Sequence, residues 1–110
     1  MRLTTLTVLL GLALVAPAAA AEKLTLMLDW FVNPDHAPII VADAQGYFAA
    51  AGLEVEIVAP ADPNDPPKLV AAGQADVAIS YQPQLHIQVD RGLPLTRIGM
   101  AKRGPVPLRR

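Results

Sequence analysis

The segment LDWFVNPDH, residues 28–36, gathers side chains that could bind a small molecule. Trp30 has a flat apolar ring and one N–H donor, which suits stacking on a planar ligand, although a Trp equally packs helices against sheets. Asn33 can present a donor and an acceptor to the edge of a heterocycle, and it is also a common turn residue. His36 could hydrogen-bond a ligand from the start of a helix, but an isolated His is more often structural or exposed. Each of these residues therefore has a binding and a structural interpretation.

No residue pattern in the chain predicts catalysis or a metal site. His36 and His86 lie 50 residues apart and the chain has no Cys, so the usual metal-ligand spacings are missing. Ser80 has no positioned base beside it, as a nucleophile requires. Asp29 and Asp35 could act as acid and base, but carboxylates next to a helix start are usually caps. We therefore expect ligand binding, with no catalytic residue, no metal and no cofactor.

The elements that must position these residues alternate between strands and helices. Residues 23–28 are at least partly apolar at nearly every position, which is typical of a strand buried on both faces. Residues 53–59 alternate apolar side chains with Glu54 and Glu56, as in a strand with one solvent-facing side. The full prediction is strands at 23–28, 53–59, 75–80 and 93–101, and helices at 36–52, 67–74 and 81–92. This alternation with short connections predicts an open α/β parallel sheet with flanking helices and right-handed crossovers.

Two polar loops follow predicted strands and each carries an aromatic residue. One spans residues 29–36 after the first strand, and the other spans residues 80–84 after the third. Open α/β sheets bind ligands beyond the carboxyl ends of their strands. Because the first and third strands are often neighbours in this class, we expect the two loops to flank one crevice.

The first 21 residues have the anatomy of a secretory signal peptide. Arg2 supplies a positive start, residues 3–16 are mostly apolar, and Pro17 precedes a run of alanines that suits cleavage. The apolar run of 14 residues falls short of the roughly 20 that a membrane-spanning helix needs. Because the chain has no Cys for lipid attachment, we expect an exported protein without a lipid anchor.

Charge divides the remaining chain near residue 97. Residues 22–96 hold ten acidic and three basic residues, whereas residues 97–110 hold five basic and no acidic residues. A basic tail can contact nucleic acid or membranes, but this one lacks aromatic residues and helical periodicity, so we expect no nucleic-acid partner. The predicted organisation is a signal peptide at 1–21, part of an α/β lobe at 22–100 and an irregular basic tail at 101–110.

Three segments together resemble one protein family: LDWFVNPDHAPIIVA at 28–42, GYFAAAGLEVEIV at 46–58 and LVAAGQADVAIS at 69–80. The chain is similar to the thiamine-pyrimidine-precursor binding proteins of bacterial ABC importers. These are similar in turn to eukaryotic thiamine-pyrimidine synthases and, more distantly, to sulfonate- and nitrate-binding proteins. The GYF and GL residues are shared across the superfamily, whereas DWFVNPDHAPI together with SYQPQ points to the pyrimidine branch. The resemblance covers residues 23–100.

The resemblance implies a periplasmic-binding-protein-like fold, in which two α/β lobes close over a ligand and of which this chain holds the first lobe only. It also implies a periplasmic protein that captures a formylated aminopyrimidine for thiamine salvage and delivers it to an ABC permease and its ATPase subunit. By this analogy Trp30 stacks on the pyrimidine. The other implied ligand contacts are Asn33, His36, Ser80, Tyr81 and Gln82.

The chain departs from these families in two ways. The eukaryotic synthases have a Lys that holds pyridoxal phosphate and a His that is consumed as a donor, and the alignment of ADVAIS puts Ser80 and Gln84 in those places. Ser80 has no amine for a Schiff base and Gln84 has no imidazole, so we expect no enzyme activity. The second departure is length, because two lobes need roughly 300 residues by the usual domain size. The ending KRGPVPLRR predicts a frameshift, a gene fragment or an early stop.

Three alternatives stay open at this point. The chain could bind another small solute, of the sulfonate or nitrate type, but a basic residue in the loops would favour an anion and neither loop has one. It could be a relative of the pyrimidine synthases, or a fragment without a function of its own.

Overall fold

The computed structural model of the protein describes residues 19–101. The predicted signal peptide at 1–21 and the predicted basic tail at 101–110 lie almost entirely outside these residues. Within residues 19–101, no helix is both long enough and apolar enough to cross a membrane.

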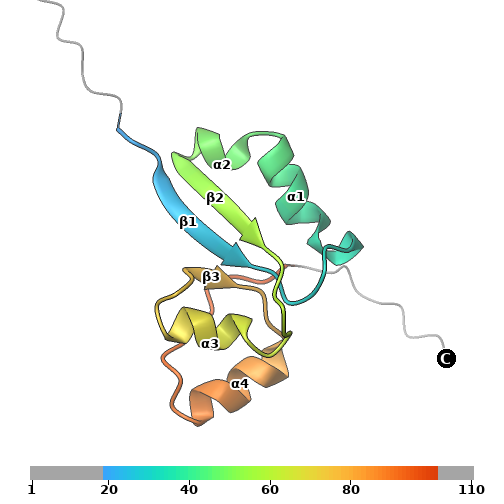
Figure 1. Cartoon of the computed structure of the whole chain (residues 1–110), viewed down its shortest axis with the longest axis vertical. Coiled ribbons are helices and arrows are strands. Elements are labelled where there is room, and N and C mark those ends of the chain that lie inside the picture. The colour runs from blue at the N-terminus through green and yellow to red at the C-terminus, as the bar shows by residue number, and fades with distance from the viewer. Residues whose placement is uncertain (1–18, 102–110) are drawn as a thin grey trace, which may run out of the picture.

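A parallel sheet of three strands forms the centre of the fold. Its strands are β1 (Glu22–Met27), β2 (Leu53–Val58) and β3 (Val77–Ala78), in the spatial order β2-β1-β3 (Figure 1). In the middle strand, Leu26 pairs with Ile57 on one side and with Val77 on the other. The predicted α/β class with a parallel sheet is therefore confirmed, and β1 is the strand through which the two halves of the sheet are joined.

The strands follow the predicted side-chain patterns. In β2, Glu54 and Glu56 are exposed while Leu53, Val55 and Ile57 are partly buried, as the alternation predicts. The central strand ends in buried residues, since Met27 is 7% exposed and Leu28, directly after it, is 0% exposed. The short β3 is extended by sheet-like hydrogen bonds at both ends, from the Asp76 amide to the Thr25 carbonyl and from the Ile79 amide to the Met27 carbonyl.

The helices lie on two sides of this sheet. In Figure 1, α1 and α2 are on the β2 side, whereas α3 and α4 are on the β3 side. A single helix was predicted at 36–52, but Gly46 has a φ of 72° and breaks it, because that left-handed conformation interrupts the helical hydrogen bonds. The helices are the 3-10 turn η1 (Pro34–His36), α1 (Ala37–Ala44), α2 (Tyr47–Ala50), α3 (Pro66–Ala71) and α4 (Gln82–Asp90).

The predicted fourth strand at 93–101 is wrong. Residues 93–101 form no strand, and the side chains of Ile98 and Met100 are 79% and 71% exposed. After α4 the chain turns, with the Leu93 amide donating to the Gln88 carbonyl and the Leu95 amide donating to the Leu93 carbonyl. A strand needs a partner edge for its backbone groups, and an apolar pattern by itself does not supply one.

The apolar core of the described chain is small. Met27, Leu28 and Ala75 are its buried hydrophobic residues: Met27 ends β1, Leu28 follows it, and Ala75 lies shortly before β3. Chains of about this size bury a modest fraction of their surface and are correspondingly marginal in stability. Each buried side chain in this core therefore contributes a large share of the total folding stability.

Replacement of Leu28 by Ala should lower the free energy of unfolding by about 2–5 kcal/mol, because it empties a fully buried site at the end of the central strand. Urea-induced unfolding followed by circular dichroism measures the change. The control is Ile98→Ala, a similar truncation at an exposed side chain, which should change stability by no more than about 0.5 kcal/mol. Equal losses in the two variants would contradict this placement of the core.

Candidate functional site

The two loops that were predicted to bind a ligand leave the same edge of the sheet. Strands β1 and β3 are parallel neighbours, with Met27 paired with Ala78 at their carboxyl ends. The prediction that the first and third strands are neighbours in the sheet is thus confirmed. The loop after β1 and the loop after β3 start side by side, where open α/β sheets bind ligands.

Asn33 holds the first loop together. Its side-chain oxygen accepts a hydrogen bond from the Asp35 amide at 2.9 Å, and its Nδ2 donates to the Phe31 carbonyl at 2.9 Å. This is the N-cap of η1, so the structural interpretation of this Asn is realised. Both polar atoms of the Asn33 amide are engaged inside the loop, and its contact with a ligand stays a prediction.

His36 lies inside the protein and pairs with Asp29. The residue is 2% exposed, and its Nε2 lies 2.6 Å from Asp29 Oδ1. The other ring nitrogen, Nδ1, accepts a hydrogen bond from the backbone amide of Asn33 at 3.3 Å. An accepting Nδ1 carries no proton, so Nε2 donates to the carboxylate. With both nitrogens occupied and the ring covered, this geometry gives His36 a positioning role; a ligand contact by His36 stays a prediction.

Asp29 is the residue of this site that sequence reasoning missed. The sequence offered it only as a helix cap or as one of an acid–base pair, because nothing in the pattern shows that position 36 folds back onto position 29. Its carboxylate accepts a hydrogen bond from His36 Nε2 at 2.6 Å, and the Tyr81 side chain in the second loop contributes to lowering its pKa. Asp29 therefore closes the first loop onto His36.

The environment of Asp29 favours its ionised form. Partial burial raises the pKa of this carboxyl, but the hydrogen bonds from His36 and Tyr81 outweigh burial and hold the pKa below the ordinary value of 3.8. A carboxylate that accepts two side-chain hydrogen bonds is stabilised as an anion, so Asp29 stays charged at neutral pH.

Trp30 is exposed beside this pair. Trp30 is 48% exposed as a whole residue. Its ring contacts the Phe31 ring edge to face, with ring centroids 5.6 Å apart and an interplanar angle of 83°. Edge-to-face contact is a favourable arrangement of aromatic rings, and it helps to fix the orientation of Trp30. The loop thus leaves about half of a large aromatic residue accessible to solvent.

The second loop presents polar groups and one aromatic ring. Ser80 is partly buried, and its hydroxyl donates to Gln84 Oε1 at 3.2 Å. Tyr81 is 66% exposed, and its side chain is one of the groups that lower the pKa of Asp29. The exposed Gln82 donates through Nε2 to the Nε2 atom of His86 at 3.4 Å. Ligand contacts by these predicted residues stay predictions, and the structure shows which of their groups already have protein partners.

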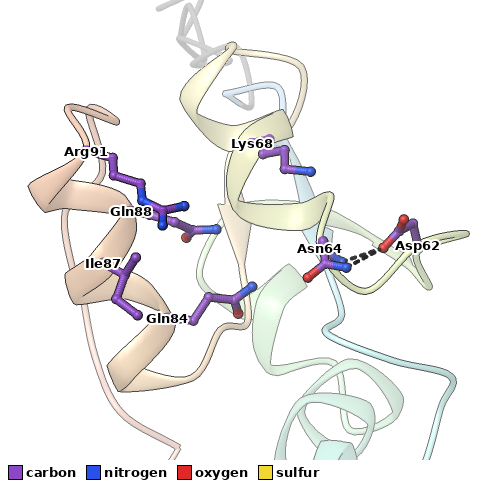
Figure 2. A pocket seen from close by; sticks show the side chains of 7 residues that line it. All are labelled: Asp62, Asn64, Lys68, Gln84, Ile87, Gln88 and Arg91. Carbon is purple, nitrogen blue, oxygen red and sulfur yellow. Dashed lines mark hydrogen bonds between the residues drawn. The ribbon is translucent and has the colours of Figure 1, made fainter.

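A separate open groove of about 510 Å³ lies between α3 and α4 (Figure 2). In this groove Asp62 Oδ1 accepts two hydrogen bonds from Asn64, one from its backbone amide at 2.8 Å and one from its side-chain Nδ2 at 3.0 Å. These bonds lower the pKa of Asp62. The groove shares only Gln84 with the second loop. Its lining residues are Asp62, Asn64, Lys68, Gln84, Ile87, Gln88 and Arg91.

The groove differs in charge from the two loops. Lys68 and Arg91, which line it, are two of the three basic residues between residues 22 and 96. Neither ligand loop contains a basic residue. In the part of the chain that the structure describes, no group of three His, Cys, Asp or Glu side chains is placed to hold a metal ion.

Comparison with known proteins shows which family this chain is similar to. The family described as "NMT1/THI5 like" matches residues 33–105 of the chain. A Haemophilus influenzae protein whose name assigns it to thiamine biosynthesis is 57% identical over 97 residues. A formylaminopyrimidine-binding protein of Halalkalibacterium halodurans is 40% identical over 87 residues. A 4-amino-5-hydroxymethyl-2-methylpyrimidine phosphate synthase of Uromyces fabae is 35% identical over 80 residues.

These relatives are much longer than the chain. The three matches cover 88%, 79% and 73% of this chain but only 31%, 26% and 24% of the respective relatives. The chain therefore spans about a third or less of the length of the curated relatives it matches. The relatives include both a binding protein and synthases, so similarity by itself leaves both kinds of activity open.

Stability should depend on pH through Asp29. Because the folded-state pKa of Asp29 lies below the ordinary value of 3.8, the folded chain binds fewer protons than the unfolded chain in that range. The stabilisation is fully present above the ordinary pKa and is lost as the pH falls through the folded-state pKa. The acid limb is the part of the stability curve in which the free energy of unfolding falls as the pH is lowered. In Asp29→Asn the contribution of Asp29 to this acid limb should disappear, and the free energy of unfolding at neutral pH should fall by about 1–3 kcal/mol.

Urea unfolding measured between about pH 2 and pH 7 tests this expectation. The matched control is Asp43→Asn, the same change at an exposed carboxylate on α1, which should keep the acid limb of the parent chain. An unchanged acid limb in Asp29→Asn would show that the Asp29 pair does not contribute to stability.

Proposed function

The chain belongs to the NMT1/THI5-like family, and we propose that its two strand-end loops bind a thiamine-related aminopyrimidine. The observation that carries the proposal is the exposed Trp30 ring, fixed by Phe31 at the carboxyl end of the central strand and next to the loop of β3. The relative named for formylaminopyrimidine binding supports this ligand class.

An aminopyrimidine matches the chemistry of the two loops. It is a flat, uncharged heterocycle, so stacking on Trp30 would provide most of the affinity. Its ring nitrogens and amino group need donors and acceptors at the edge, which Ser80 and Gln82 could supply from the second loop. The absence of a basic residue in both loops favours this neutral ligand over a sulfonate or nitrate.

The proposed activity is reversible binding without bond chemistry. At the position where the resemblance places the cofactor-holding Lys of the synthases, Ser80 has a hydroxyl, which cannot form a Schiff base. Gln84, in the place of the donor His, is instead the hydrogen-bond acceptor of Ser80 at 3.2 Å. The residues present therefore do not fit pyridoxal phosphate, and the synthase relatives are not a guide to catalysis here.

At the level of the cell, the proposed role is that of the solute-binding component of an ABC importer. The protein would be exported to the periplasm by its signal-peptide-like N-terminus, capture the pyrimidine and pass it to a permease that works with an ATPase subunit. The support is the sequence pattern of residues 1–21 and the family resemblance. Because the relatives are about three times longer or more, delivery is proposed for the whole protein to which this lobe corresponds.

Replacement of Trp30 by Ala should weaken the affinity for a formylaminopyrimidine roughly tenfold to a hundredfold, because stacking of a base on an aromatic ring contributes about 1–3 kcal/mol. Isothermal titration calorimetry measures the dissociation constant. The matched control is Tyr47→Ala, which removes another exposed aromatic ring, on α2 and away from both loops. It should bind like the parent chain, and a Trp30→Ala variant with unchanged affinity would sink the proposal.

A second experiment separates binding from synthase-like chemistry. Incubation with pyridoxal phosphate followed by borohydride reduction should leave the peptide that contains residue 80 unmodified, because Ser80 has no amine. The Ser80→Lys variant, which supplies that amine, is the positive comparison and should give an adduct at position 80 by peptide mass spectrometry. A pyridoxyl adduct at this peptide in the parent chain would contradict the assignment.

A further inference from the structure

The groove between α3 and α4 has cationic side chains on both of its sides. Lys68 extends from α3, and Arg91 extends from the end of α4 (Figure 2). Residues 22–96 hold ten acidic residues and only three basic ones, so two of the three cations of this range line a single groove. The one carboxylate of the lining is Asp62, whose Oδ1 already accepts two hydrogen bonds from Asn64. The lining therefore has a net positive charge, which favours an anion.

Neither cation of the groove is held by a strong ion pair. Among residues 19–101, Arg91 has no ion-pair partner. Lys68 pairs with Asp65 at 3.4 Å, but both side chains of this pair are exposed. An exposed ion pair contributes little to stability, because solvent screens it and two side chains must be ordered to form it. Both cations can therefore turn towards a ligand at a small cost in free energy.

Two glutamines of α4 add hydrogen-bonding groups to the groove. The Ser80 hydroxyl donates to Gln84 Oε1 at 3.2 Å, so the group that Gln84 can offer to the groove is its Nε2 donor. Gln88 has its Oε1 buried without a hydrogen-bond partner. An acceptor in this state is unfavourable, and the terminal amide of a Gln rotates easily about χ3. A ligand that brings a hydroxyl donor can therefore satisfy Gln88.

We propose that the groove between α3 and α4 binds a small phosphate monoester that also carries a hydroxyl group. The phosphate lies between Lys68 and Arg91, because its charge of about −1.5 to −2 matches two cations and its oxygens accept from an ammonium, a guanidinium and the Gln84 amide. A carboxylate has one charge and two oxygens, so it would use fewer of these donors. The ligand hydroxyl donates to Gln88 Oε1.

The size of the groove agrees with an organic ester. Its volume of about 510 Å³ lies in the range of small-molecule sites and leaves room for more than a phosphate ion. Ile87, which is 52% exposed, supplies an apolar wall for the carbon atoms of the ligand. This site is separate from the two strand-end loops, and its occupation does not depend on the proposed aminopyrimidine binding.

Titration of the full chain with glycerol 3-phosphate, followed by the amide signals in NMR spectra, tests the site. The signals of the groove residues should shift together. Arg91→Gln and Lys68→Gln should each weaken binding about tenfold, which is the scale of one hydrogen bond to a charged group. The matched controls are Arg97→Gln and Lys23→Gln, which remove exposed cations outside the groove and should bind like the parent chain. Equal losses in the controls would mean unspecific attraction of an anion and would overturn the site.

Two further probes test the class of ligand. Propyl phosphate lacks the hydroxyls, and the parent chain should bind it about three- to tenfold more weakly than glycerol 3-phosphate, the scale of one neutral hydrogen bond. Gln88→Met should remove this preference, because it removes the acceptor. Inorganic phosphate should bind more weakly than either ester.

Several results would overturn the proposal. Equal affinity for the two esters in the parent chain would remove the role of Gln88, and inorganic phosphate that binds as tightly as glycerol 3-phosphate would make free phosphate the ligand. Signals that shift only in residues 29–36 and 80–83 would place the phosphate at the strand-end loops. A chain that binds glycerol 3-phosphate in the groove but no pyrimidine would refute the proposed function and leave this site standing.

Discussion

The hydrogen bond between Asp29 and His36 is the contact on which the site depends. Each unpaired nitrogen of a buried imidazole would lower the folding stability by roughly 1–3 kcal/mol. Here the Asp29 carboxylate accepts from Nε2, and the backbone amide of Asn33 donates to Nδ1. These bonds join the two ends of the loop that starts at β1 and ends at η1. Because the ends are fixed, the residues between them, Trp30 and Phe31, can be exposed without the loop losing its shape.

The central position of β1 gives this contact a fixed starting point. A strand paired on both sides transmits its position to β2 and β3 through regular backbone hydrogen bonds. Its last residue, Met27, and the following Leu28 are also buried apolar residues of a small core. Asp29 therefore follows a well-fixed part of the chain, and the His36 ring that pairs with it is held in a defined place.

Charge distinguishes the strand-end loops from the groove between α3 and α4. The loops at the strand ends combine aromatic rings, amides and one anchored carboxylate, which suits a neutral heterocycle with polar edges. Lys68 and Arg91 instead line the groove between α3 and α4, so the cationic side chains are kept out of the loops. The relatives of this chain include a binding protein and synthases, and by the resemblance the proposed difference from the synthases lies in two side chains, Ser80 in place of a Lys and Gln84 in place of a His.

The sequence by itself determined the class of fold, because periodicity and the short connections between elements are local properties. Alternation in residues 53–59 and the apolar run at 23–28 were sufficient to predict two parallel strands, and the loops that follow strands one and three were predicted to bind the ligand. What the sequence could not determine is which side chains in those loops meet. Only the tertiary structure placed His36 inside against Asp29, brought the ends of β1 and β3 side by side and left residues 93–101 without a strand partner. The reason is physical, because hydrogen bonds between loops and pairing at a sheet edge depend on positions in space that no local pattern encodes.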